Sequence, residues 1–136
     1  MKNRIFAFND VAAFEKELVQ FKDWCKENGS PNICFQIHSE ELDPEKLNSV
    51  WGTLERVFPD VPWFGNSTSG NIVNCDKANE ISVSAIIFEK PTSKFEIYQY
   101  DFSKKSISDI IVDAGAVALA SAASTKENAK SILNTK

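Results

Sequence analysis

The sequence predicts an α/β domain of the mixed α+β kind, in which helices pack on a sheet with both parallel and antiparallel strands. Two observations lead to this prediction. In the first half of the 136-residue chain, apolar extended runs alternate with amphipathic helical patterns. A strand–helix–strand order favours a right-handed crossover between parallel strands. In the second half, two extended runs follow each other directly, which favours an antiparallel hairpin. The length fits one domain over residues 1–136.

The first predicted elements are a short strand and an amphipathic helix. Residues 5–8 alternate weakly between apolar and polar, as a strand does. Asn9 or Asp10 then caps a helix, because apolar residues recur after it at spacings of three and four. Gly29 suits the position just past that helix, where a left-handed backbone is common. The apolar stripe consists of Val11, Phe14, Leu18, Phe21 and Cys25.

A second strand, a second helix and a third strand follow. Residues 33–37 are apolar at nearly every position, which is typical of a strand covered on both faces. Asp43 caps the second helix and Pro44 takes its favoured first position. Residues 61–64 predict a short strand that ends at Gly65. The apolar face of the second helix consists of Leu47, Val50, Trp51, Leu54, Val57 and Phe58.

The second half of the chain predicts two strands and a helix. Residues 81–88 alternate most clearly, and residues 95–102 are expected to return antiparallel to them. Ser106 or Ser108 caps a third helix, whose apolar part at residues 110–123 is rich in small side chains. Residues 125–136 are polar and are expected to be a linker or a truncated helix.

Composition excludes several classes of function. The net charge is −4 and the Lys and Arg residues are scattered, whereas a nucleic-acid surface needs clustered cations. No apolar run approaches the roughly 20 residues of a membrane span, and the N-terminus lacks the apolar core of a signal peptide. Three cysteines without a C-x-x-C pair argue against a disulfide framework and a zinc site. We therefore expect a cytoplasmic protein without a membrane partner, metal or cofactor.

The segment from Gly65 to Asn71 is the candidate binding loop. It follows a strand, where open α/β sheets place ligands, and its small side chains leave backbone N–H groups open to an anion or a carboxylate. A tight surface turn is the alternative. The segment is not a phosphate-binding loop of the nucleotide-hydrolysing kind, since Asn71 and Ile72 stand where that motif needs Lys and then Ser or Thr.

The same segment resembles a known signature. The run Trp63-Phe64-Gly65-Asn66-Ser67-Thr68-Ser69-Gly70-Asn71 is similar to the G-C-S-T-A-G-E signature of FIST domains. Asn66 replaces the usual Cys, Ser69 the Ala and Asn71 the Glu. The order of strands and helices over residues 30–124 fits as well. The chain is shorter than a full FIST module, so the resemblance implies its N-terminal portion.

The resemblance implies a bacterial sensory domain in the cytoplasm. Such domains are proposed to bind small ligands, and they are fused to signalling outputs such as diguanylate cyclases, histidine kinases or chemoreceptors. A fused C-terminal signalling domain is therefore the expected partner, and no catalytic residues are expected in this domain. The expected ligand-binding residues are Trp63, Phe64, Gly65, Asn66, Ser67, Thr68, Ser69 and Gly70, with the first two as an apolar wall.

Two other functions stay open. The small-residue helix at residues 110–123 suits a dimerisation or docking module, which predicts a homodimer. A cysteine-dependent enzyme would use Cys34 or Cys75 as the nucleophile and His38, the single histidine, as the base. Cys34 and His38 share a strand face but lie ~13 Å apart along it, so a small buried thiol and a polar strand end are the favoured interpretation.

Overall fold

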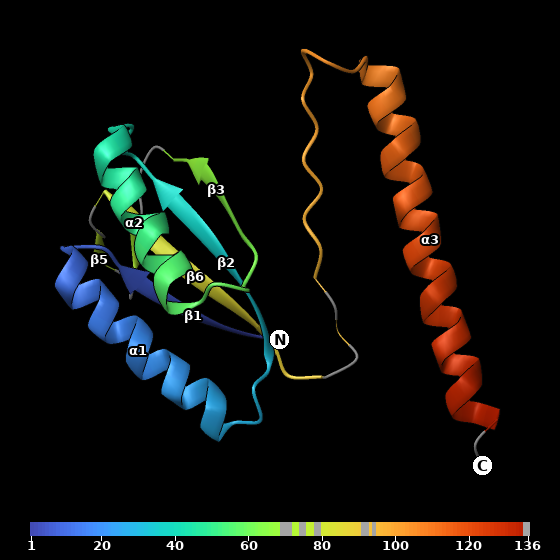
Figure 1. Cartoon of the computed structure of the whole chain (residues 1–136), viewed down its shortest axis with the longest axis horizontal. Coiled ribbons are helices and arrows are strands. Elements are labelled where there is room, and N and C mark those ends of the chain that lie inside the picture. Colours follow the sequence, from blue (N-terminus) through green and yellow to red (C-terminus); the bar gives the residue numbers. More distant parts are fainter. Residues whose placement is uncertain (69–71, 74–75, 78–79, 91–92, 94, 135–136) are drawn as a thin grey trace. The chain divides into compact units, whose positions relative to one another are not determined.

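The computed structural model of the chain describes residues 1–68, 72–73, 76–77, 80–90, 93 and 95–134, with side chains omitted for 72–73, 76–77 and 121–134 (Figure 1). The chain divides into two compact units, Met1–Ile97 and Tyr98–Lys136.

The first unit is built on a four-stranded mixed sheet. Its strands are β1 (Lys2–Ala7), β2 (Asn32–Ser39), β3 (Trp63–Ser67) and β6 (Ile81–Phe88), in the spatial order β1-β6-β2-β3. β2 and β3 are parallel, while β6 is antiparallel to both β1 and β2. A separate hairpin of β4 (Ile72–Val73) and β5 (Asp76–Lys77) connects β3 to β6. The predicted fold class is confirmed.

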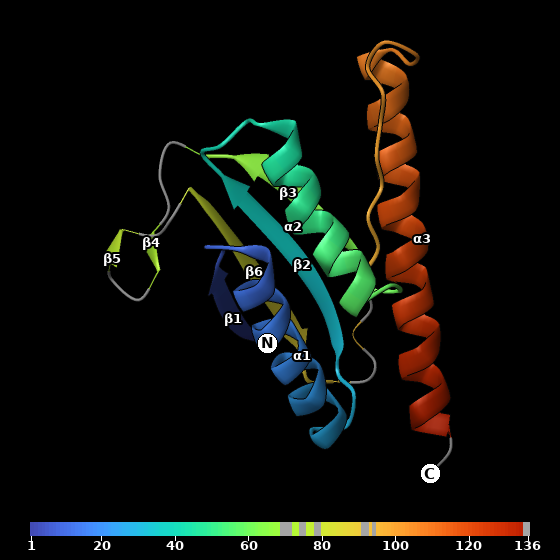
Figure 2. The same ribbon diagram turned by 60° about the vertical axis from the view of Figure 1, so that its left-hand side comes forward.

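Two helices cover one face of this sheet (Figures 1 and 2). Helix α1 (Val11–Glu27) begins at Asp10, whose carboxylate accepts a hydrogen bond from the N–H of Ala13 at 2.9 Å. Helix α2 (Pro44–Val57) begins at Asp43, which caps the N–H of Glu45 at 3.0 Å. Both predicted caps are confirmed, because capping depends on residues within one turn of the helix start.

The core between helices and sheet is dominated by phenylalanine. Phe21 of α1 and Phe58 at the end of α2 both pack on Phe35 of β2, with ring centroids 6.4 and 5.1 Å away. Phe21 also meets Phe6 of β1 edge-on at 5.6 Å, and the Arg4 guanidinium lies 5.4 Å from the Phe21 ring centroid. Phe21 is therefore the residue through which α1, α2 and the sheet are joined.

The opposite face of the sheet carries a mixture of small, polar and aromatic side chains. Strand alternation places Cys34, Gln36 and His38 of β2 on this face, with Ser82 and Ser84 beside them on β6. Phe95, which follows β6, stacks on Phe64 of β3 at 6.2 Å and lies 5.9 Å from Phe88. Neither helix of the first unit packs on this face.

The predicted hairpin between residues 81–88 and 95–102 is wrong. Residues 95–101 form no strand, and the true antiparallel partners of β6 are β1 and β2. With a neighbour on each side, β6 has no free edge to offer a following segment. The third predicted strand also differs, since β3 continues to Ser67 instead of ending at Gly65.

The second unit consists of a connecting segment and one long helix, α3 (Ile107–Asn134). Ser106 is the cap, because its hydroxyl accepts from the N–H of Asp109 at 3.2 Å. The helix continues to Asn134, without a break near residue 125. Several of its described apolar side chains are exposed, namely Ile107, Ile111, Val112 and Leu119. Among the described residues, no helix combines the length and apolar character needed to cross a membrane.

The position of Phe21 predicts its contribution to stability. Replacing this fully buried ring by Ala should lower the free energy of unfolding by about 3–5 kcal/mol, because it leaves a cavity where three elements meet. Val19→Ala on the exposed side of α1 should cost no more than about 0.5 kcal/mol. Urea unfolding followed by circular dichroism measures both, and equal losses in the two variants would contradict this description of the core.

Candidate functional site

A hollow of about 270 Å³ lies at the carboxyl ends of the parallel strands β2 and β3, on the face covered by the helices. Side chains from β2, from the loop that follows it, from α2 and from β3 surround it. In open α/β sheets, this end of parallel strands is where ligands bind. The lining residues are Ile37, Ser39, Glu41, Leu42, Leu47, Trp51, Trp63, Gly65, Asn66 and Ser67.

An aromatic pair forms one wall of the hollow. The indole rings of Trp51 on α2 and Trp63 on β3 stack with centroids 5.6 Å apart and planes inclined by 20°. Leu47 of α2 and Leu42 of the preceding loop complete the apolar lining, and Leu42 is 71% exposed. The exposed leucine and the stacked indoles together form an apolar surface on which a small apolar ligand can pack.

Gly65 accounts for the open space beneath that wall. Residues 63, 65 and 67 of β3 are directed to the helix side, in register with Phe35, Ile37 and Ser39 of β2. A side chain at position 65 would begin 3.4 Å from both the Cβ and the carbonyl oxygen of Ile37, and would then extend into the hollow. Since the glycine has no side chain, the backbone itself is exposed as the floor.

The polar rim of the hollow is formed by the loop between β2 and α2. One oxygen of the Glu41 carboxylate, Oε1, accepts from the N–H groups of Leu42 and Asp43 at 2.9 and 3.0 Å, and Oε2 accepts from Lys46 Nζ at 2.9 Å. The hydrogen bond from Lys46, together with those two N–H groups, lowers the pKa of Glu41 to about 2. Glu41 is therefore ionised at neutral pH and holds the loop in place.

Lys46 also links this loop to the start of β6. Its ammonium group lies 3.1 Å from Oε2 of Glu80 as well as 2.9 Å from Glu41, and both carboxylates raise the pKa of Lys46. The N–H of Glu40 donates to the carbonyl of Glu80 at 2.8 Å. The rim of the hollow is thus tied to β6, one of the two inner strands of the sheet.

The structure divides the predicted site residues into four groups. Trp63, Gly65, Asn66 and Ser67 line the hollow. Phe64 is directed to the opposite face of the sheet, where it stacks on Phe95. The N–H of Thr68 donates to the carbonyl of Ser39 at 2.8 Å. Ser69 and Gly70, with Asn71, lie outside the described residues.

The expected turn lined by open amides needs correction over Gly65–Ser67. These residues belong to β3, so their backbone follows the sheet ladder and does not curl into a nest. The hollow arises instead from a missing side chain at Gly65 and from side chains of α2 above it.

Sequence reasoning missed Glu41, Leu42, Leu47 and Trp51 as lining residues. Leu47 and Trp51 were assigned only to the apolar stripe of their helix, and most of that stripe is indeed core. No signal in the sequence separates these two from the rest, because the whole stripe has the spacing of an ordinary core-facing helix.

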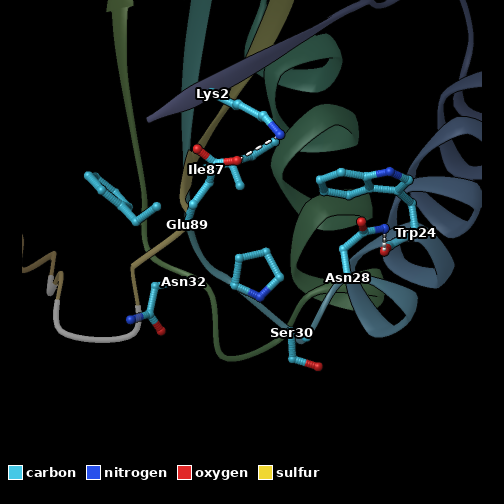
Figure 3. Close-up of a pocket in the computed structure, with 10 residues that line it drawn as sticks. Lys2, Trp24, Asn28, Ser30, Asn32, Ile87 and Glu89 are labelled. Carbon is cyan, nitrogen blue, oxygen red and sulfur yellow. Dashed lines mark hydrogen bonds and ion pairs between the residues drawn. The ribbon is translucent and has the colours of Figure 1, made fainter.

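A larger hollow of about 380 Å³ lies at the opposite end of the sheet (Figure 3). Its charged wall is an ion pair between Lys2 Nζ and Glu89 Oε1 at 2.7 Å. The Asn28 amide donates to the carbonyl of Trp24 at 2.8 Å, and the indole of Trp24 stacks on Phe21 behind it. These polar groups are already paired with one another, so this hollow is the weaker candidate.

The cysteines do not form a reactive centre in the described part of the chain. Burial raises the pKa of the Cys34 thiol to about 11, and burial also raises the pKa of Cys25. Thiols of this kind stay protonated at neutral pH and are poor nucleophiles. Cys75 lies outside the described residues. Among the residues that are described, no three potential metal ligands come together.

Comparison with known proteins assigns no family to the chain. No family model matches it, and no curated protein is detectably similar to it in sequence. The geometry of the hollow over Gly65 is therefore the main indication of function.

The depressed pKa of Glu41 predicts a pH dependence of stability. Its carboxylate stabilises the fold above the ordinary pKa of 4.5, and that contribution is lost as the pH falls toward 2. The melting temperature of the wild type should therefore exceed that of Glu41→Gln most clearly above about pH 5, and the difference should vanish near about pH 2. Lys46→Met should behave similarly because it removes the main partner. A difference that is constant with pH would contradict the proposed contacts.

Proposed function

We propose that this chain is a sensory input domain that binds a small, mainly apolar ligand in the hollow over Gly65 and controls a fused signalling output. The observation that carries the proposal is the uncovered glycine backbone beneath the stacked Trp51 and Trp63 rings at the carboxyl ends of two parallel strands. The likeness of residues 63–71 to the FIST signature supports it, and with it a cytoplasmic setting and an output such as a diguanylate cyclase.

The lining of the hollow supports a ligand with an apolar or aromatic ring. Two indoles and two leucines offer apolar surface, while Ser39 and Ser67 have hydroxyl groups on the helix side of the sheet. The amide of Asn66 is directed to the opposite face, where its Oδ1 accepts a hydrogen bond from Gln36 at 3.4 Å. A few polar groups around an apolar wall fix the orientation of a small ligand. No acid–base pair or reactive thiol lines this hollow, so binding without covalent chemistry suits it.

The rim of the hollow supports a route for the signal. Binding can transmit a signal only if the ligand favours one arrangement of the domain over another. Glu41 lines the hollow and is joined through Lys46 to Glu80, next to the start of β6. A ligand that displaces the loop carrying Glu41 and Leu42 would therefore alter the contact between Lys46 of α2 and Glu80 at the start of β6.

Filling the hollow tests the proposal. Indole and a panel of aromatic metabolites are added to the wild type, and melting temperature and tryptophan fluorescence are recorded against concentration. A ligand should raise the melting temperature in proportion to the logarithm of its concentration above Kd. Gly65→Leu should abolish that shift because its side chain occupies the hollow.

Gly52→Leu is the matched control, because a Cβ at position 52 meets nothing within 4 Å. It adds the same side chain to α2 outside the hollow and should keep the response. If no probe shifts the wild type, or if both variants respond alike, the proposed site is wrong.

Dimerisation through α3 is the second candidate function. Ile111, Val112 and Leu119 are exposed on a helix of 28 residues, and such apolar stripes commonly pack against another helix. Light scattering should then give the mass of a dimer, and Leu119→Glu should shift the mass to that of a monomer.

Ala120→Glu, at an exposed position on the opposite side of the helix from Ile111, should leave the dimer intact. A wild-type chain that is monomeric at high concentration would rule out this function.

A further inference from the structure

The strand β3 forms one edge of the sheet in the described part of the chain. It pairs with β2 alone, and two hydrogen bonds bracket the ladder: Phe35 N–H to the carbonyl of Pro62 at 3.0 Å, and Thr68 N–H to the carbonyl of Ser39 at 2.8 Å. Bonding residues alternate along a parallel ladder. The backbone N–H and C=O groups of Trp63, Gly65 and Ser67 are therefore directed to the outer edge.

This edge lacks the features that usually prevent strand addition. The other edge strand of the sheet, β1, carries the exposed charges Lys2 and Arg4. The five residues of β3 carry no charge and no proline. Uncharged edge strands with free backbone groups accept a further strand.

The hollow over Gly65 lies beside this edge on the helix side. A strand added next to β3 directs every second side chain to that side, and a side chain opposite Gly65 lies about 5 Å from the glycine. It would enter the space bordered by Leu42, Trp51 and Trp63. The edge and the hollow together match the binding of an extended peptide, in which backbone pairing supplies affinity and a pocket supplies specificity.

The charges around the hollow define the flanks of such a peptide. Glu40, Glu41, Asp43 and Glu80 gather at the carboxyl ends of β2 and β3, and Lys46 is the cation that pairs with two of them. Acidic residues in excess attract a basic partner. Since same-face residues of a strand are two positions apart, a basic residue two positions from the apolar anchor faces this rim.

We propose that the ligand of this site is an extended peptide segment that pairs with the free edge of β3, inserts one large apolar side chain over Gly65 and places a basic residue near Glu41. This inference rests on the proposed function, since it uses the same hollow, and it goes beyond that function by naming the ligand class. A second copy of β3 could pair with the same edge, but its one large side chain on the helix side, Trp63, is already stacked on Trp51 of its own copy, so the peptide explains more of the geometry.

The test uses labelled seven-residue peptides of the pattern Thr-Lys-Thr-anchor-Thr-Lys-Thr, with Leu, Phe, Trp or Ala as the anchor and both ends blocked. Fluorescence polarisation should show a Kd at least about tenfold lower for the best large anchor than for Ala, because a buried apolar side chain is worth roughly 1.5–3 kcal/mol. N-methylation of alternate residues separates the two edges of the peptide. Methyl groups on the N–H groups that face β3 should weaken binding about tenfold, because they remove hydrogen bonds to the strand. Methyl groups on the N–H groups of the other residues, which face solvent, should leave binding unchanged.

Two variants of the chain connect the peptide to this site. Gly65→Leu should remove the preference for a large anchor, whereas Gly52→Leu should keep it. Ser67→Pro removes a donor on the outer edge without disturbing the ladder to β2 and should weaken every peptide. Melting temperatures near the wild-type value establish that each variant is folded.

The outcomes separate this inference from the proposed function. If indole binds but no peptide does, the peptide class is overturned and a small-molecule site remains. If neither binds, both proposals fail. Should light scattering show a dimer that Ser67→Pro dissociates, the edge belongs to a second copy and the peptide proposal is wrong.

Discussion

The parallel pairing of β2 with β3 is the constraint on which the rest of the site depends. It sets Ile37 opposite Gly65 and Ser39 opposite Ser67, so the ends of both strands meet the start of α2 at one place. The crossover through α2 then places Trp51 above Trp63. A shift of the register by one residue would turn Gly65 to the opposite face and close the hollow with a larger side chain.

The core and the site use aromatic residues in different ways. Phe6, Phe21, Phe35 and Phe58 are buried and meet at tilted or edge-on angles, which fills space between layers. Trp51 and Trp63 stack nearly face to face and are only half-buried. Edge-on and tilted contacts therefore fill the centre of the domain, whereas a stacked pair provides an accessible apolar surface at the end of the strands.

Local signals in the sequence were sufficient for the helix starts. Asp10, Asp43 with Pro44, and Ser106 act on N–H groups within three residues, so the chain near them decides the result. The strand expected at residues 95–102 failed for a different reason. Its pattern suited a strand, but β1 and β2 had already taken both edges of β6, and no local pattern records which edges are free.

By itself the sequence determined the starts of the helices and the order strand–helix–strand–helix–strand in the first half of the chain, because these follow from residue types and periodicity over a few positions. The mixed sheet was also expected, but through a hairpin with residues 95–102 that does not form. Only the tertiary structure decided that Gly65 lies within a strand and that Leu42, Leu47 and Trp51 wall the hollow. It also decided that β3 is an edge. The physical reason is that pairing and packing join residues distant in the chain, through contacts that local propensity does not encode.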